Sequence, residues 1–395
     1  MKPLVLMGRL PAANFVGLDG ERRIVRLRSP GSFPADDRDA VLIADDNDWA
    51  LACADGYRLA IGRGERPDGI PLSYVRLPAR FAELGEGDVL SIYPESGRVR
   101  VLYRRSSRHN FFLVTERCNN YCLMCSQPPK KADDGWLIDE IAQTLPLVDP
   151  ETVALTFTGG EPLTEWRRFI GLLDLARDLL PDTAVHVLTN GRAFSSPEVA
   201  QAWAAVDHPQ LSAGIPIYSA VDHIHDYVVQ AKGAFDQTVL GVLHLKDRGQ
   251  RVEIRIVLHA VTAPRLRQTC SWIARNLPFV DHVALMGMEN TGFAIANDDM
   301  LWIDPIDYQE QLKAGVEVLS TAGINTSIYN LPLCVLDPSI RPFAMQSISD
   351  WKNSYVEECG SCTARRDCAG FFSTGRPKFS RGIAAIQVAQ RSMPI

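Results

Sequence analysis

The sequence lacks any run approaching the ~20 consecutive apolar residues that a membrane-spanning helix needs. Its first residues, MKPLVLMGRLPAANF, contain neither a long apolar core nor a small-residue cleavage site, so we expect no signal peptide and no contact with a membrane. The sequence also lacks an excess of basic residues, with 41 Lys and Arg against 47 Asp and Glu. Because nucleic-acid binding depends on clustered Lys and Arg, a nucleic acid is disfavoured as a partner.

The chain does have ample size, an ordinary apolar content and many cysteines. Its 395 residues allow a large catalytic domain and one or two further domains, at roughly 100–200 residues per domain. A hydrophobic content of 46% predicts a sizeable core. We expect a cytoplasmic location, and in that reducing compartment nine cysteines indicate metal or redox chemistry rather than disulfides.

Residues 1–105 are expected to form a small β-rich N-terminal domain. Short β-like runs at Arg23–Arg28, Ala40–Ala44 and Val99–Tyr103 are separated by turn signals, and Gly87–Tyr103 predicts a β-hairpin. Nothing in this part carries obvious chemistry. It could bind a leader peptide or a partner protein, or serve a purely structural purpose.

Residues 106–300 alternate between predicted strands and helices, which is typical of an α/β fold. Repeated βα units imply a parallel sheet covered by helices, and six strands suit a partial (β/α)6 barrel, similar to part of a TIM barrel. Functional residues should then lie at the carboxyl ends of the strands. The expected strands are Phe111–Thr115, Thr152–Phe157, Ala184–Leu188, Leu211–Tyr218, Val252–Leu258 and His282–Met286, and the expected helices are Leu137–Leu147, Glu165–Leu180, Pro197–Val206, His225–Lys246 and Arg265–Leu277.

Residues 301–395 are expected to form a C-terminal extension. A further helix is predicted at Pro305–Thr321 and a short strand at Ile324–Tyr329, followed by a loop-rich tail with several cysteines.

The strongest signal is the segment Cys118-Asn-Asn-Tyr-Cys122-Leu-Met-Cys125, directly after the first expected barrel strand. Thiolates this close together can converge on one centre, and they are the ligands of iron–sulfur clusters. A four-iron cluster with three protein ligands keeps one iron open to a substrate. The alternative is zinc, but zinc sites of this kind usually have a second Cys or His pair nearby. Residues Ser126–Lys131 supply none.

The spacing C-x3-C-x2-C resembles the signature of the radical S-adenosylmethionine (SAM) superfamily. The resemblance implies a [4Fe–4S] cluster on the three cysteines, SAM bound at the open iron, and reductive cleavage of SAM to a 5′-deoxyadenosyl radical. It implies no essential acid–base residue for that cleavage, so no catalytic side chain is predicted. Two later strand ends carry companion motifs in the family's order: Gly159-Gly160-Glu161-Pro162 and Thr189-Asn190-Gly191.

The resemblance also implies roles for these motifs. Gly159–Pro162 would meet the methionine amino group of SAM, mainly through backbone carbonyls, and its glycines permit close approach of the backbone. Asn190 would contact the ribose, although a simple turn explains Thr189–Gly191 as well. Arg255, inside a buried strand, needs a partner, either the SAM carboxylate or a structural Asp or Glu. Met124 resembles a place where the family packs the adenine, as does Val283–Glu289, although ordinary core packing explains the same hydrophobicity.

A second set of cysteines lies near the C-terminus. Four cysteines would fully ligate one cluster, and the pattern resembles the twitch or SPASM-like auxiliary-cluster extensions of peptide-modifying radical SAM enzymes. Structural zinc is the alternative, because four-cysteine zinc sites are common. Cys53 and Cys270 are left over as ordinary buried residues. The second set is Cys334, Cys359, Cys362 and Cys368.

Beyond the motifs, the chain resembles the radical SAM maturases of the His-Xaa-Ser peptide modification system, of the HxsC type. The resemblance implies a small ribosomal precursor peptide as substrate, a second radical SAM maturase as partner, and an electron donor such as flavodoxin or ferredoxin. Residues His223, His225 and Asp226 form a cluster where His225–Val239 resembles a helix entry common in such enzymes. We expect them to orient the helix and loop, and a catalytic role is the alternative. The supporting stretches are Arg117–Lys130, Phe157–Leu163, Gly214–Ser219, His225–Val239 and Glu358–Phe372.

Two other functions compete with this hypothesis. The first is a radical SAM enzyme acting on RNA, a nucleotide or a cofactor precursor. The second is a non-enzymatic metal-binding interaction protein. The strand end Gly214–Ser219, GIPIYS, departs from the commoner peptide maturases, so no SAM contact is transferred to it.

Overall fold

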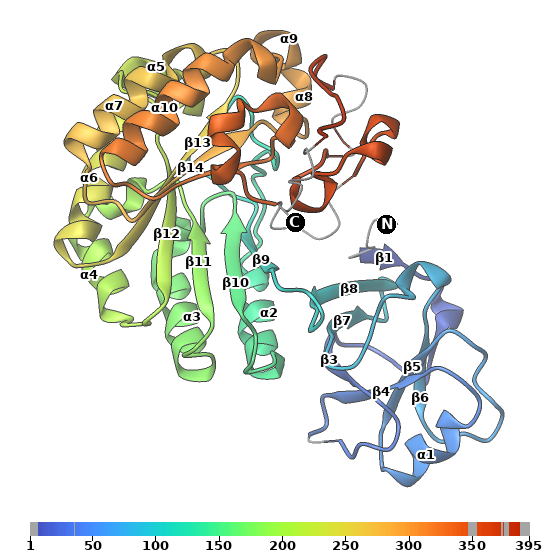
Figure 1. The fold of residues 1–395 in the computed structure, drawn as a ribbon. Coiled ribbons are helices and arrows are strands. Elements are labelled where there is room, and N and C mark those ends of the chain that lie inside the picture. The colour runs from blue at the N-terminus through green and yellow to red at the C-terminus, as the bar shows by residue number, and fades with distance from the viewer. Residues whose placement is uncertain (1–6, 35, 347–353, 373, 375–378, 388–395) are drawn as a thin grey trace, which may run out of the picture.

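The computed structural model describes residues 7–34, 36–346, 354–372, 374 and 379–387. Two β-sheets organise this part of the chain, one near the N-terminus and one in the middle (Figure 1). No helix in the described ranges is long and apolar enough to cross a membrane.

The N-terminal sheet has eight strands in the order β1-β8-β7-β3-β4-β5-β6-β2. Strands β3 to β6 run parallel, and β7 and β8 form the antiparallel hairpin that the sequence predicts. One short helix, α1 (Asp48–Ala54), packs against β4. The strands are β1 (Met7–Arg9), β2 (Phe15–Val16), β3 (Arg23–Arg28), β4 (Asp39–Ile43), β5 (Leu59–Gly62), β6 (Ser73–Arg76), β7 (Val89–Tyr93) and β8 (Arg98–Tyr103).

The second sheet is the parallel α/β sheet expected from the sequence. All seven strands are parallel and lie in the order β15-β14-β13-β12-β11-β10-β9, so the sheet is open between its first and last strands. The strands are β9 (Asn110–Thr115), β10 (Ala154–Gly159), β11 (Ala184–Leu188), β12 (Leu211–Pro216), β13 (Arg251–Leu258), β14 (His282–Gly287) and β15 (Thr326–Tyr329).

Helices cover the outer face of this sheet, and the apolar spacing of the sequence explains their packing. In α3, Phe169, Leu172, Leu173 and Ala176 lie on one helical face and are buried. The helices are α2 (Trp136–Thr144), α3 (Trp166–Leu179), α4 (Pro197–Ala205), α5 (Asp222–Val229), α6 (Ala234–Asp247), α7 (Leu266–Asn276), α8 (Phe293–Ala296), α9 (Asp298–Leu301) and α10 (Gln309–Thr321).

The inner face of the sheet is more polar than the outer face. Along β13, Val252, Ile254 and Ile256 are fully buried, whereas Glu253 and Arg255 alternate with them and are partly exposed. Successive side chains of a strand point to opposite faces, so these two charged groups face the interior of the barrel.

Two elements differ from the sequence-based expectation. The strand expected in the C-terminal extension, near residues 324–329, is β15 and pairs with β14 in the barrel sheet. The single helix expected over His225–Lys246 is instead two helices, because the chain turns at Gln230 and Gly233, with φ of 54° and 73°. The Asp226 carboxylate stabilises the break by accepting bonds from the N–H groups of Gly233 and Phe235.

The N-terminal sheet is joined to the barrel by a shared core. Ile24, Val89 and Tyr103 belong to the same buried cluster as the barrel strands. The Tyr103 hydroxyl lies 2.7 Å from Thr152 Oγ1. The nearly inaccessible carboxylate of Glu140, in α2, accepts a bond of 2.6 Å from the Tyr93 hydroxyl. Hydrogen bonds to charged groups each contribute about 1.5–3 kcal/mol to stability, so this bond helps to hold the N-terminal sheet against α2.

Candidate active site

The three clustered cysteines lie in the loop that follows β9, at the carboxyl end of the sheet. Cys118, Cys122 and Cys125 are all partly exposed and line a single cavity of about 830 Å³. Carboxyl ends of parallel strands meet at one edge, which explains why later strand ends reach the same cavity. The predicted cofactor residues that also line it are Met124, Gly159, Gly160, Thr189, Asn190 and Arg255.

Three predicted cofactor residues do not line the cavity: Glu161, Pro162 and Gly191. Glu161 is only 1% exposed. Its carboxylate accepts bonds from Thr189 Oγ1 at 2.7 Å and from the N–H groups of Asn190 and Leu163 at 2.6 and 3.0 Å. Burial raises the pKa of Glu161, while these donors lower it. The Glu161 side chain therefore ties the end of β10 to the end of β11.

The two glycines before Glu161 allow close contact within the protein. A Cβ on Gly159 would lie 2.4 Å from the carbonyl oxygen of Thr115, and one on Gly160 would lie 2.1 Å from that of Arg117. Both distances are far shorter than a van der Waals contact. The glycines thus let the end of β10 pack against the start of the cysteine loop, whose backbone accepts bonds of 2.8 Å from the N–H groups of Gly160 and Glu161.

Backbone hydrogen bonds hold the middle of the cysteine loop. The N–H groups of Tyr121 and Leu123 donate to the carbonyls of Val229 and Val228, at 3.0 and 2.9 Å. These carbonyls belong to the last turn of α5, where carbonyl groups have no partner within the helix. The Phe293 N–H, at the start of α8, donates to the Cys125 carbonyl at 2.8 Å.

An arginine that the sequence analysis missed holds the loop from the side of β11. Arg192 donates to the Asn119 carbonyl at 2.8 Å and to Asn120 Oδ1 at 2.6 Å, both between Cys118 and Cys122. Its Nε also donates to Gln237 in α6, at 2.7 Å. The loop is therefore tied to two elements of the barrel that lie more than 70 residues further along the chain.

Asn190, the predicted ribose contact, has protein partners here. Its side-chain amide donates to Asn119 Oδ1 at 2.6 Å, and its Oδ1 accepts from the Arg192 N–H at 3.0 Å. Gly191 follows with φ of 77°, which supports the turn that the sequence allowed. The ribose contact stays a prediction, and the observed bonds connect this turn to the cysteine loop.

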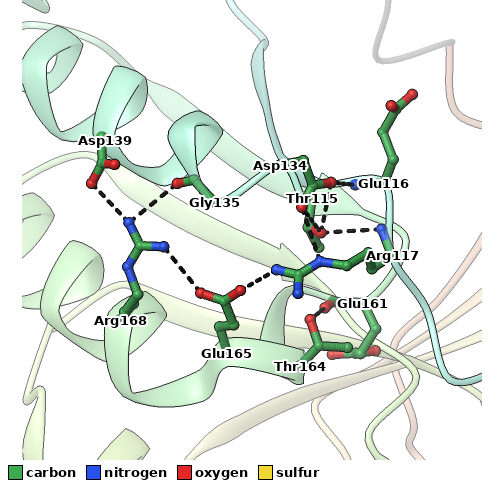
Figure 2. Close-up of polar contacts among 10 residues, drawn as sticks. All are labelled: Thr115, Glu116, Arg117, Asp134, Gly135, Asp139, Glu161, Thr164, Glu165 and Arg168. Atoms are coloured by element: carbon green, nitrogen blue, oxygen red, sulfur yellow. Dashed lines mark hydrogen bonds and ion pairs between the residues drawn. The ribbon is translucent and has the colours of Figure 1, made fainter. Parts of the chain in front are cut away.

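A second arginine anchors the start of the loop (Figure 2). Arg117, next to Cys118, donates from Nε to Asp134 Oδ1 at 3.0 Å. Asp134 is 3% exposed. It also accepts bonds from the Thr115 hydroxyl and from the Glu116 N–H, at 2.9 and 2.5 Å. One buried carboxylate therefore fixes the end of β9 together with the first residues of the loop.

Glu165 extends this network to the helices. It pairs with both Arg117 and Arg168, and these two partners lower its pKa. Arg168 reaches Asp139 in α2 at 2.8 Å. The Arg117 side of the loop is thereby joined to α2 and α3.

Burial of the three thiols favours their protonated form. Burial raises the pKa of Cys118 to about 11 and that of Cys122 to about 12, and the neighbouring thiols add to the shift. Burial also raises the pKa of Cys125. Since metals bind thiolates, loading this site must release protons.

Arg255 has a structural partner. Its Nη1 donates to Glu253 Oε1 at 2.6 Å, and its Nη2 lies 3.1 Å from Met286 Sδ. Glu253 also lies 2.7 Å from His282 Nδ1. Although burial opposes it, the bond from His282 and the nearby positive charge of Arg255 lower the pKa of Glu253 to about 2. Of the two partners considered for Arg255, the structure shows a structural carboxylate, that of Glu253.

Met124 fits both interpretations offered for it. It lines the cavity, yet it is only 7% exposed and packs in a buried cluster with Leu123, Tyr218 and Val228. His225, on the same helix as Val228, accepts a bond from the Tyr218 N–H at 3.2 Å. Together with the contacts of Asp226, this orients the loop and the helices, as expected from the sequence for these two residues. His223 is exposed, and its ring lies 3.2 Å from the neighbouring Asp222 carboxylate.

The second cysteine set combines Cys334 with Cys359, Cys362 and Cys368, which lie together in a later segment. Cys334 lies near enough to Cys368 and Cys359 that, after burial, they help to raise its pKa. Cys359 and Cys362 act on Cys368 in the same way. Of the leftover cysteines, Cys270 is fully buried as expected, but Cys53, on α1, is only partly buried.

Backbone N–H groups point at the sulfurs of this second set. Cys368 Sγ accepts from Leu333 and Gly370 at 3.3 and 3.4 Å, and Cys362 Sγ accepts from Ile386 at 3.4 Å. Hydrogen bonds to sulfur are one of the features that tune iron–sulfur clusters.

Within the described ranges, no three His, Cys, Asp or Glu side chains converge closely enough to hold a single metal ion. A [4Fe–4S] cluster asks for a different arrangement, because each thiolate binds a separate iron. Cys118, Cys122 and Cys125 fit such a cluster: they are thiols beside a cavity, and the nearby Glu161 carboxylate is engaged by protein donors.

Residues 112–273, from β9 to α7, match the Radical SAM superfamily. The chain contains a radical SAM superfamily domain. Such a domain implies a [4Fe–4S] cluster and SAM, in agreement with the donor set at the carboxyl end of β9. The sequence has no significant match among curated proteins.

Solved structures share parts of this fold at low identity. SuiB of Streptococcus suis is 12% identical over 56% of this chain and 49% of its own length, with a TM-score of 0.44. The enzyme anSMEcpe with bound AdoMet is 16% identical over 55% of this chain and 62% of its own, with a TM-score of 0.44. Coproporphyrinogen III oxidase (HemN) from Escherichia coli is 14% identical over 54% of this chain and 53% of its own, with a TM-score of 0.44. This chain thus spans about half the length of SuiB, 49%.

Proposed function

We propose that this protein is a radical SAM enzyme that modifies a ribosomally made peptide of the His-Xaa-Ser type. The supporting observation is that Cys118, Cys122 and Cys125 line one cavity together with Gly159, Gly160, Thr189 and Asn190. When bound, the cluster and SAM would supply the reductive cleavage of SAM to methionine and a 5′-deoxyadenosyl radical. The peptide class is supported by the HxsC-like stretches of the sequence.

In this proposal the protein's own residues hold and shape the site. Cys118, Cys122 and Cys125 would ligate the cluster, and the backbone of Gly159–Pro162 would meet the SAM amino group. Arg192 and Arg117 hold the cysteine loop against the strand ends. The cavity walls would position the substrate C–H bond and exclude water from the radical.

The second cysteine set would hold an auxiliary [4Fe–4S] cluster. Its support is the approach of four thiols to one another and the backbone N–H groups aimed at Cys362 and Cys368. Electrons would come from a flavodoxin or ferredoxin in the cytoplasm, and a second maturase would act on the same precursor. These partners rest on the family resemblance.

The proposal is tested with the full chain reconstituted anaerobically with iron and sulfide, then reduced in the presence of SAM. We expect 5′-deoxyadenosine, and with a His-Xaa-Ser precursor peptide a change in peptide mass. SAM consumption with an unchanged peptide mass would remove the peptide part of the proposal. A colourless preparation that holds zinc instead of iron would remove all of it.

A further inference from the structure

The cavity at the cysteines extends far beyond them. From Cys118 it continues to Phe111 and Asn110, which lie at the opposite, amino end of β9, and then to Val101–Arg104 of β8 and the following turn. A strand rises about 3.3 Å per residue, so the five steps from Asn110 to Thr115 separate the two ends of β9 by about 16 Å. The cavity, called the groove below, therefore extends from the cysteine loop to the amino end of β9; of the strand itself, Asn110 and Phe111 line it.

The far end of this groove belongs to the N-terminal part of the chain. Glu83, Arg104 and His109 line it, whereas the near end is built by the barrel. None of these three residues belongs to the motifs at the cysteines. The N-terminal sheet thus contributes a wall to the cavity rather than standing apart from it.

Local bonds fix this wall in place. The Asn110 side chain exchanges hydrogen bonds with the backbone of Arg104, at 2.9 and 3.0 Å, which closes the turn between β8 and β9. Arg104 also donates to the Glu83 carbonyl at 3.1 Å. Arg105 pairs with Asp149, beside the barrel, at 2.5 Å. Together with the shared core, these bonds make the wall a fixed surface that a ligand meets ready-formed.

The groove has the features that suit an extended peptide. Among the described strands, β9 pairs with β10 alone, so it is the edge of its sheet. An edge strand offers backbone donors and acceptors to an added strand, while side pockets recognise alternate side chains. Phe111 provides an apolar surface, 36% exposed, and Glu83, Arg104 and His109 provide polar groups.

We infer that the N-terminal part of the chain selects the substrate: an extended peptide segment lies along β9, between Glu83, Arg104 and His109 at one end and the cysteine loop at the other. This inference rests on the proposed function. It assigns the groove along β9 to the peptide and the N-terminal wall to its recognition.

Photo-crosslinking tests the inference by binding. In the full chain, p-benzoylphenylalanine replaces Glu83, an exposed residue of the wall, or Leu51, which is 47% exposed on α1 and does not line the cavity. The probe is a synthetic peptide of His-Xaa-Ser repeats, with a short single-stranded RNA as the competing probe. We expect a peptide crosslink at the Glu83 position and none at the Leu51 position.

Kinetics provide the second readout. Phe111→Ala should raise the KM for the peptide about fivefold, because an aromatic contact is lost. Leu51→Ala should leave both kcat and KM unchanged. A rise in KM of the same size in both variants, or in neither, overturns the inference.

The other outcomes separate the inference from the proposed function. Equal peptide crosslinking at both positions, or RNA crosslinking at Glu83 in preference to peptide, overturns the groove assignment while SAM cleavage by the unmodified chain continues. Absence of 5′-deoxyadenosine from the unmodified, reconstituted chain overturns the proposed function itself.

Discussion

The two cysteine sets are assembled differently. Cys118, Cys122 and Cys125 come from one short loop after β9, and side chains and backbone groups from α2, α3, α5, α6 and α8 hold that loop. Cys359, Cys362 and Cys368 come from one segment of short 3-10 turns, and Cys334 comes from an earlier 3-10 turn. The first set is a local motif with distant supports, whereas the second joins a local group of three cysteines to one distant cysteine, Cys334.

This difference bears on what each set can do. The first set offers three sulfurs beside an open cavity. The second offers four sulfurs, two of which accept backbone N–H groups, and none of its cysteines lines that cavity. A centre with an open iron can bind a substrate, whereas a fully ligated centre can only exchange electrons or support the structure.

The largest expected effect is at the first set. Cys118→Ala, Cys122→Ala or Cys125→Ala should abolish 5′-deoxyadenosine formation, because the cluster loses one of only three protein ligands. Product analysis by mass spectrometry measures this. The matched control is Cys53→Ala, outside both sets. Wild-type 5′-deoxyadenosine formation in any of the three variants would contradict the assignment of that cysteine.

At the second set the effect should be divided. Cys359→Ala or Cys362→Ala should leave SAM cleavage partly intact and block conversion of the peptide, and bound iron should fall by about half. Iron content and the two product yields are measured on the same preparation. If both sets respond identically, the division of labour between them is wrong.

A smaller effect is expected at the supports of the first loop. Arg192→Ala removes the bonds to Asn119 and Asn120, and unpaired groups of this kind cost about 1–3 kcal/mol. We expect iron to be lost from the first set to a chelator several-fold faster, with the second set unaffected. Arg167→Ala is the control, because Arg167 is an exposed arginine that pairs with Glu198 on the surface. Equal rates for the two variants would show that Arg192 does not hold the loop.

The smallest expected effect is a difference in acid sensitivity. Burial lowers the pKa of His225 to about 4, so between about pH 6.5 and 4 the unfolded chain binds a proton that the folded chain does not. Stability therefore falls as the pH drops through this window. All eight histidines precede residue 283, so this applies to the barrel and not to the second set.

Two double variants measure this difference. Cys359→Ala/Cys362→Ala isolates the first set, and Cys118→Ala/Cys122→Ala isolates the second. Visible absorption during acid titration should show the first set bleaching at the higher pH. The reverse order would contradict the prediction. His223→Ala is the control, because His223 is exposed whereas His225 is buried.

Much of the fold follows from local patterns. The six expected barrel strands are present as β9 to β14, because apolar runs bounded by turns read directly as buried parallel strands. The helix break after Val229 was missed, because nothing in Gln230 signals a left-handed backbone. β15 was assigned to the extension because it follows residue 300, although it lies no further from β14 in sequence than β10 lies from β9.

In the candidate site, too, some features could be predicted from the sequence and others could not. Cysteine spacing and glycine-rich strand ends can be read from the chain, because each is complete within a few residues. The function of Arg192 could not be read, because its partners lie 72 and 73 residues away and arginine after a turn is common. The partner of Arg255 lay two residues away, but only the strand's alternation places Glu253 on the same face.

Gly160 sets a limit on how this chain can change. Its missing methyl group is what allows the turn after β10 to press against the residue before Cys118. Any larger residue there would push the first sulfur away from the other strand ends, even though position 160 touches no metal ligand through a side chain of its own. The separation between the cysteine loop and the motifs around it thus depends on position 160 having a hydrogen atom in place of a side chain.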